Sequence, residues 1–195
     1  MNDFKPFLPK AETEYSAMVA QFAAKSKDLT TRFFHVANQT EAVEVIKKME
    51  EEEEEKWTSL ASHHTPLTDS TVEKLGLPCL WTDPGYATAD LEKVPVSITT
   101  CDALIAQTGS VFLTSKSCGG RAISILPPHH IVLATKEQLL SDLPTAYKYM
   151  QEKYADGYPS MMTLVTGPSR TGDIERILVL GAHGPRKLTV ILIEG

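Results

Sequence analysis

The chain has 195 residues, of which 42% are hydrophobic and 23% charged, a size that favours one domain with a full core. Its formal net charge is −6, and the run Glu50–Glu55 alone holds six acidic residues, so the rest is balanced and has no basic stripe of the kind that binds nucleic acid. No run of 18 apolar residues and no apolar leader are present, so we expect no membrane segment and a cytoplasmic location. The three cysteines, Cys79, Cys101 and Cys118, are too few for an internal four-cysteine iron–sulfur cluster or zinc site.

The N-terminal part is predicted to be helical. Apolar residues spaced three and four apart in Ala11–Asp28 indicate an amphipathic helix, which we expect to be a peripheral extension (residues 1–30) of a single domain over 1–195. Asn38 with Glu41 three residues later predicts a capping box and a second helix that ends in the acidic tract. That tract is either a contact for a basic partner or a solvated helix end, and the second interpretation is favoured.

Further along the chain, apolar strands alternate with amphipathic helices. Strands are expected at Phe33–Ala37, Trp57–Ala61, Val94–Thr99, Val111–Thr114, Ile131–Ala134, Met161–Val165 and Leu188–Ile193, and helices at Ser70–Leu75, Asp102–Gln107 and 139–154. Pro144 predicts a kink or a fresh helix start near Leu143. This alternation predicts an α/β fold, Rossmann-like, with a mostly parallel sheet and helices on both faces.

The loop Thr166–Glu175 follows a predicted strand and precedes a helix start, an arrangement that presents backbone N–H groups to an anion. Ser169 and Thr171 add hydroxyl donors, and Arg170 adds a planar fork suited to a carboxylate or phosphate. Asp173 could bind a ligand or cap the following helix. The loop has no Walker lysine and no G-x-G-x-x-G motif, so the standard nucleotide-binding motifs are absent. Its glycines are therefore interpreted with equal support as plain turn residues or as part of an anion-binding loop.

Two other loops are predicted to join this one at the carboxyl edge of the sheet. In Gly181–Arg186, His183 is either an acid/base or ligand donor, or a side chain that pins its loop. Gln107–Ser110 offers amides at a neighbouring edge, and Arg121 is either a second anion contact or a surface residue. The candidate ligand-binding residues are Gln107, Thr108, Gly109, Ser110, Arg121, Gly167, Pro168, Ser169, Arg170, Thr171, Asp173 and Gly184, with His183 as the candidate catalytic residue.

A metal site is not expected. The pairs His63-His64 and His129-His130 are adjacent, and neighbours on an extended backbone point to opposite faces. A site built from His183 with Asp173 or Glu175 has no supporting motif spacing. Cys118 beside two glycines is interpreted as a small turn residue rather than a reactive thiol.

Four segments together resemble the lactate-utilisation (LUD) domain family: Asp102–Ser110, Leu126–Ile131, Thr166–Glu175 and Gly181–Arg186. Gln107 stands where many family members carry Glu. The resemblance implies a fold of the NagB/RpiA/CoA-transferase type. It also implies that the chain acts with iron–sulfur partner proteins in oxidising L-lactate to pyruvate, with no cofactor of its own.

The leading functional hypothesis is therefore a subunit of a lactate-oxidising system that binds a small anion or anionic cofactor at the glycine loops. Two alternatives stay open. One is an independent enzyme acting on a phosphorylated or CoA-like substrate, which rests on fold analogy. The other is a non-catalytic scaffold in which the glycine loops only turn the chain.

Overall fold

A computed structural model describes residues 10–171, 179–180 and 184–195. In chain order its elements are α1 (Tyr15–Asp28), β1 (Arg32–Val36), α2 (Gln39–Glu52), β2 (Leu60–Ser62), α3 (Pro66–Leu75), β3 (Cys79–Trp81), α4 (Thr88–Leu91), β4 (Val96–Thr100), β5 (Ala103–Ile105), β6 (Ser110–Thr114), β7 (His129–Thr135), the 3-10 turn η2 (Lys136–Gln138), β8 (Leu139–Leu140), α5 (Leu143–Lys153), β9 (Met162–Val165), β10 (Arg170–Thr171), β11 (Val179–Leu180) and β12 (Lys187–Ile193).

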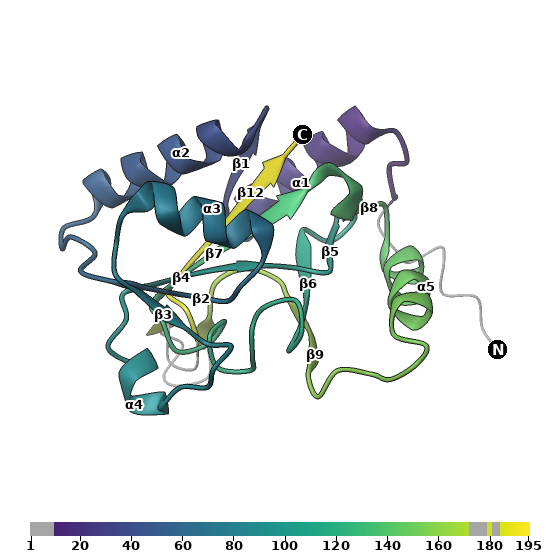
Figure 1. Ribbon diagram of the computed structural model, residues 1–195. Helices are drawn as coiled ribbons and strands as arrows, with labels where there is room; N and C mark the ends of the chain where they lie inside the picture. Colours follow the sequence, from purple (N-terminus) through teal and green to yellow (C-terminus); the bar gives the residue numbers. More distant parts are fainter. Residues whose placement is uncertain (1–9, 172–178, 181–183) are drawn as a thin grey trace.

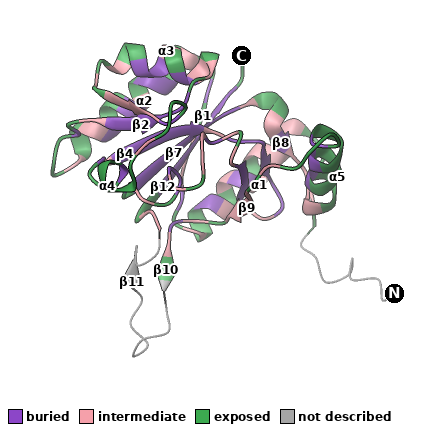
Figure 2. Ribbon diagram, turned by 60° about the horizontal axis from the view of Figure 1, so that its bottom comes forward, coloured by how far each residue is buried: buried purple, intermediate pink, exposed green. Residues whose placement is uncertain are grey.

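The centre of the molecule is a six-stranded sheet in the order β1-β12-β7-β4-β2-β3, in which every pair is parallel. Because both faces of such a sheet are covered, its inner strands are buried on both sides (Figure 2). Along β7, Ile131 and Leu133 face one side of the sheet and Val132 and Ala134 the other. The predicted mostly parallel α/β sheet is confirmed.

Helices α2 and α3 cover one face of this sheet (Figure 1). The apolar stripe of α2, which includes Ile46 and Met49, packs on Ile131, Leu133 and Ile191. The Asn38 side chain accepts a hydrogen bond from the Glu41 N–H, so the predicted cap of α2 is present.

The opposite face is covered by α1 together with a second sheet, which the sequence did not indicate. The second sheet has the order β8-β5-β6-β9, and its inner side chains Leu104, Val111 and Leu113 share a core cluster with Phe22 of α1. Its outer face carries α5, whose Ala146 and Met150 pack on this sheet in a separate cluster. Helix α5 lies at one side of the molecule in Figure 1.

The helix predicted at Asp102–Gln107 is wrong, because this segment contains strand β5. It pairs antiparallel with β6, with Leu104 opposite Val111, and parallel with β8. A run of six residues closes too few helical hydrogen bonds to offset the cost of nucleation, whereas strand pairing buries both of its faces.

The predicted fresh helix start near Leu143 is confirmed. Residues Leu139–Leu140 form β8, and α5 begins at Leu143 with Asp142 as its N-cap, whose side chain accepts from the Thr145 N–H. Pro144 lies in the first turn of α5, where its missing N–H costs nothing. Among the described residues, the helices are too short or too polar to span a lipid bilayer.

Candidate functional site

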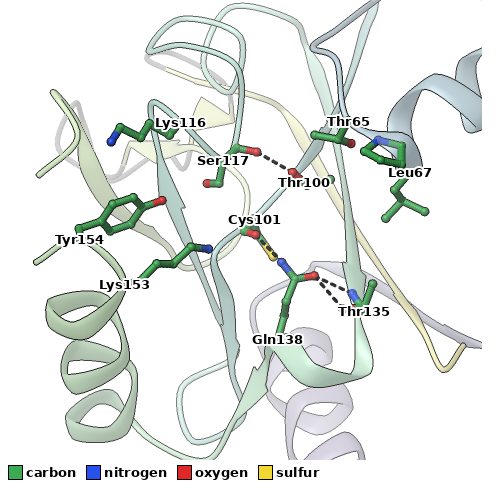
Figure 3. A pocket seen from close by; sticks show the side chains of 11 residues that line it. Thr65, Leu67, Thr100, Cys101, Lys116, Ser117, Thr135, Gln138, Lys153 and Tyr154 are labelled. Atoms are coloured by element: carbon green, nitrogen blue, oxygen red, sulfur yellow. Dashed lines mark hydrogen bonds between the residues drawn. The ribbon is translucent and has the colours of Figure 1, made fainter. Parts of the chain in front are cut away.

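A cavity of about 520 Å³ opens at the carboxyl edge of the six-stranded sheet (Figure 3). This volume lies in the range of about 300–1,000 Å³ that is typical of small-molecule sites. Its lining comes from several elements and consists of Thr65, Pro66, Leu67, Thr100, Cys101, Lys116, Ser117, Thr135, Gln138, Lys153 and Tyr154.

The position of this cavity in the sheet is one that favours ligand binding. Strands β2 and β4 are neighbours, but the chain leaves β2 toward β3 on one side and leaves β4 toward β7 on the other. Parallel α/β sheets hold their ligands outside the carboxyl ends of such diverging strands. Thr65 follows β2 and Thr100 ends β4, so both border this switch point. We refer to the space as the switch-point cavity.

One wall is the N-terminal end of α3. Thr65 is the N-cap, and its hydroxyl accepts from the Thr68 N–H while the Thr68 hydroxyl accepts from the Thr65 N–H. Pro66 occupies the first turn. The helix dipole adds partial positive charge to this side of the cavity.

The opposite wall carries the charged groups. In Figure 3 the Lys153 ammonium and the Tyr154 hydroxyl point toward the middle of the set of side chains. Lys153 Nζ lies 2.8 Å from Oδ1 of Asp102, a fully buried residue, and the Tyr154 hydroxyl donates to the same oxygen at 2.7 Å. Burial alone would lower the pKa of Lys153, but the hydrogen bond and the charge of Asp102 raise it above its usual value. Burial raises the pKa of Tyr154; the hydrogen bond with Thr114 opposes this effect, and the contact with Asp102 adds to it.

A second lysine stands at the rim. Lys116 Nζ lies 5.3 Å from the centre of the Tyr154 ring, and the neighbouring Ser117 accepts a hydrogen bond at its carbonyl from the Thr100 hydroxyl at 2.7 Å. The described residues that line the cavity include two lysines and no carboxylate. With its hydroxyls and the amide of Gln138, such a lining suits a small organic anion.

The structure brings most of the predicted glycine-loop residues together, but at the end of α1 rather than at this cavity. The Thr108 hydroxyl donates to Ser110 Oγ at 2.8 Å, and Ser110 Oγ lies 2.8 Å from the hydroxyl oxygen of Thr166. Strands β6 and β9 pair so that Val111 lies opposite Val165, which places the two loops side by side.

Both glycines of this cluster meet α1. Gly109 has φ +67°, and a Cβ there would lie 2.7 Å from the Lys25 Cβ. Gly167 has φ +94°, and its Cβ would lie 3.1 Å from the Leu29 carbonyl oxygen. Arg170 donates from Nη2 to that same carbonyl oxygen and to the Thr30 hydroxyl. The absence of a side chain at both glycines therefore allows α1 to pack closely against these two loops.

Three backbone N–H groups of these loops already have acceptors. The Thr108 and Gly109 N–H groups both donate to the Ile105 carbonyl, at 3.4 and 2.9 Å, and the Ser169 N–H donates to the Pro185 carbonyl at 2.8 Å. Pro168 is buried, and a Cβ on Gly184 would lie 3.2 Å from the Ser169 Cβ.

The remaining predicted residues lie elsewhere. Arg121 donates to Ser160 Oγ at 3.3 Å, at the end of β9 opposite to Thr166, so its predicted convergence with the glycine loops is wrong. Gln107 is buried and its N–H donates to the Ser141 carbonyl at 3.0 Å. Thr171 contributes its backbone to β10, whereas Asp173 and His183 lie outside the described residues.

The described histidines and cysteines do not form a metal centre. Within the described part of the chain there is no group of three His, Cys, Asp or Glu side chains that could hold an ion. His130 Nε2 contacts the Thr99 hydroxyl at 2.8 Å and His129 Nε2 the Thr189 hydroxyl at 2.9 Å, and burial lowers the pKa of each to about 3. Burial raises the pKa of Cys118 to about 12, in agreement with a structural residue.

Sequence reasoning missed the cationic wall of the cavity. Thr100, Cys101 and Asp102 directly follow a predicted strand, so the rule on carboxyl strand ends could have marked them. Lys116 and Lys153 lie in a turn and at a helix end, and only the folded chain shows that they reach the same cavity.

A mostly parallel sheet covered on both faces, with a cavity at its switch point, defines the chain as an α/β fold of the Rossmann-like type. The LUD domain model matches residues 86–193, more than half of the chain, and the chain belongs to the LUD domain family. The match includes Thr100, Lys116 and Lys153, whereas the α3 wall lies outside it.

Several curated relatives are named lactate utilization protein C. That of Oceanobacillus iheyensis is 36% identical over 105 residues, covering 53% of this chain and 45% of the relative. That of a Geobacillus species is 38% identical over 104 residues (52% and 43%), and that of Deinococcus radiodurans is 31% identical over 120 residues (61% and 56%). The chain thus spans about half the length of the curated relatives it matches.

One solved structure supports the fold. A DUF162 family protein from Deinococcus radiodurans superposes with a TM-score of 0.74 at 22% identity, covering 93% of this chain and 99% of the other. The relation to the NagB/RpiA/CoA-transferase fold stays a prediction.

Proposed function

We propose that this protein takes part in lactate utilization and that it binds a small organic carboxylate in the switch-point cavity. The observation that carries the proposal is the Lys153 ammonium, which points into a cavity with a second lysine at its rim and no carboxylate among its described lining residues. The names of the relatives supply the metabolic setting.

In this proposal the protein acts in the cytoplasm with partner proteins that carry iron–sulfur clusters and accept the electrons of L-lactate oxidation. A three-cysteine chain needs such partners, because it cannot ligate a four-cysteine cluster by itself. Its own contribution is to bind and orient the carboxylate. Lysine, serine and threonine side chains supply charge and hydrogen bonds for that purpose.

The glycine loops with His183 remain the second predicted location of the anion. The switch-point cavity is favoured because the N–H groups of Thr108, Gly109 and Ser169 donate to backbone carbonyls and Arg170 is bound to the end of α1. The alternatives of a phosphorylated or CoA-like substrate and of a scaffold without a ligand remain as outcomes of the test.

The test is calorimetry of the purified chain with L-lactate and with pyruvate. We expect Lys116→Met to weaken binding by about tenfold or more, since a charge-assisted contact is lost. Lys148→Met is the matched control, because Lys148 is an exposed lysine of α5 whose ion-pair partner is Glu152 at 3.9 Å. Its binding should equal that of the wild type.

Three other results would refute the proposal. Loss of binding in Arg170→Ala, with Lys116→Met unchanged, would move the site to the glycine loops. Stabilisation by CoA or sugar phosphates, without any by lactate or pyruvate, would favour the independent enzyme. If none of these compounds binds, either to this chain alone or to this chain with its iron–sulfur partners, the remaining alternative is a scaffold without a ligand.

A further inference from the structure

We infer that Asp102 is a positioning residue that holds the Lys153 ammonium at the wall of the switch-point cavity as a fixed cation. This inference rests on the proposed function and deepens it, because it states how the site keeps a protonated lysine at its wall. Lys153 Nζ and the Tyr154 hydroxyl both contact Asp102 Oδ1, at 2.8 and 2.7 Å.

The burial of Asp102 makes this contact necessary. Asp102 is fully buried where the chain passes from β4 to β5, and its N–H donates to the Phe112 carbonyl at 2.9 Å. Its Oδ2 has no hydrogen-bond partner among the described residues. A carboxylate out of water requires a counter-charge, and the Lys153 ammonium lies against it.

The position of Lys153 relative to Asp102 is restricted by the elements on either side of it. It is the last residue of α5, and the next residue, Tyr154, is anchored by contact of its hydroxyl with Thr114 Oγ1 at 3.2 Å. The lysine side chain is 37% exposed, so its ammonium can face the carboxylate and the open cavity at once. Lys153 and Tyr154 thus both bind the same carboxylate oxygen of Asp102, and this shared contact restricts the rotamers of the two side chains.

The chemical consequence is that Lys153 acts as a cation rather than as a nucleophile. A lysine attacks the carbonyl carbon of a 2-oxo acid only as the neutral amine, whose lone pair forms the C–N bond while water leaves. Asp102 favours the protonated form, which has no lone pair. The protonated form is the one that pairs with a carboxylate.

The groups that face Lys153 come from several elements. The ring centres of Tyr149 and Tyr154 lie 5.4 and 5.7 Å from its Nζ. The titratable and charged residues that surround it or share its cavities are Asp102, Tyr149, Tyr154, Lys116, Cys101 and Asp156. Asp102 is the carboxylate paired with Nζ, at 2.8 Å, and a hydrogen bond with Tyr149 also raises the pKa of Lys153.

The experiment follows the Lys153 side chain directly, by NMR of the lysine 13Cε resonance, in the full chain and without any ligand. In the wild type the resonance should titrate at higher pH than it does in the urea-unfolded chain. In Asp102→Asn, which keeps the shape and loses the charge, it should titrate at lower pH than in the wild type. Tyr154→Phe is the control, because it removes a hydroxyl and retains the carboxylate.

An unchanged Lys153 titration in folded Asp102→Asn would overturn the inference. If that variant does not fold, the wild type decides, since a titration at or below that of the unfolded chain would overturn it as well. Borohydride treatment with pyruvate should leave Lys153 unmodified by mass spectrometry in the wild type, and a trapped adduct would contradict a fixed cation.

Binding measurements separate this inference from the proposed function. We expect the affinity of the wild type for pyruvate to hold to higher pH than that of Asp102→Asn. If the wild type binds neither lactate nor pyruvate while the Lys153 titration responds to Asp102, the proposed function fails and the positioning contact stands. If the wild type binds pyruvate and the titration does not respond, the proposed function stands and the inference fails.

Discussion

The guanidinium of Arg170 donates a hydrogen bond from Nη2 to the carbonyl oxygen of Leu29, the residue that caps the C-terminal end of α1. The two residues are 141 positions apart in the sequence. The last carbonyls of a helix have no partner within the helix and carry partial negative charge, so a cation is well suited to that position. This contact ties a loop predicted to bind an anion to the N-terminal helix.

Arg170→Ala should therefore destabilise the fold by about 1 kcal/mol, because an exposed charge-assisted contact to a helix end is lost. Urea denaturation measures the change, and hydrogen exchange should show faster opening of α1. Arg121→Ala is the control and should change stability by less than about 0.5 kcal/mol, since Arg121 is an exposed residue with a single side-chain contact. Equal effects of the two variants would refute a role of Arg170 in anchoring α1.

The close approach of α1 to Gly109 is tested by a pair of glycine substitutions. Gly76 and Gly109 have nearly the same backbone conformation, with φ of +71° and +67°, but a Cβ on Gly76 meets nothing within 4 Å. Gly76→Ala should cost about 1–2 kcal/mol from conformation alone. Gly109→Ala should cost at least about 1 kcal/mol more, because its Cβ clashes with Lys25. Equal losses in the midpoint of urea denaturation would show that α1 does not pack there.

Helix α1 should be essential to the main core. Phe22 is fully buried and its ring centre lies 5.0 Å from that of Phe33 in β1. Phe22→Ala should destabilise the chain by about 3–5 kcal/mol, as large-to-small changes in a packed core do. Tyr158→Ala, at a side chain that is 63% exposed, is the control and should have little effect. A small change in unfolding free energy for Phe22→Ala would mean that α1 is dispensable.

The buried histidines make the protein sensitive to acid. Burial lowers the pKa of His129 and His130 from 6.5 to about 3, so the unfolded chain binds these protons more readily than the folded chain. Their contribution to stability is complete above about pH 6.5 and is lost as the pH falls toward 3.

His130→Gln isolates one of these groups, because glutamine can keep the contact with Thr99 but does not titrate. The unfolding free energy of this variant should fall less between pH 6.5 and 4 than that of the wild type, measured by urea denaturation at each pH. His64→Gln is the control, because His64 is an exposed histidine stacked on Trp81. Parallel pH profiles for wild type and His130→Gln would refute the assignment.

The fold class could be predicted because it depends on local patterns. Alternation of apolar strands with amphipathic helices indicated the parallel sheet, and Asn38 located the start of α2. The four motifs likewise carried the family, which the match over 86–193 confirms. Each of these signals lies within a short stretch of chain.

What the sequence did not determine was which segments meet. Ala103–Ile105 has no local preference strong enough to decide its state, and pairing with β6 and β8 made it a strand. Tertiary contacts likewise placed Arg170 against Leu29. They also brought Lys153, at the end of α5, and the adjacent Tyr154 onto Asp102, between β4 and β5. A buried carboxylate needs a counter-charge close to it in space, and which lysine lies close depends on how the second sheet packs on the first.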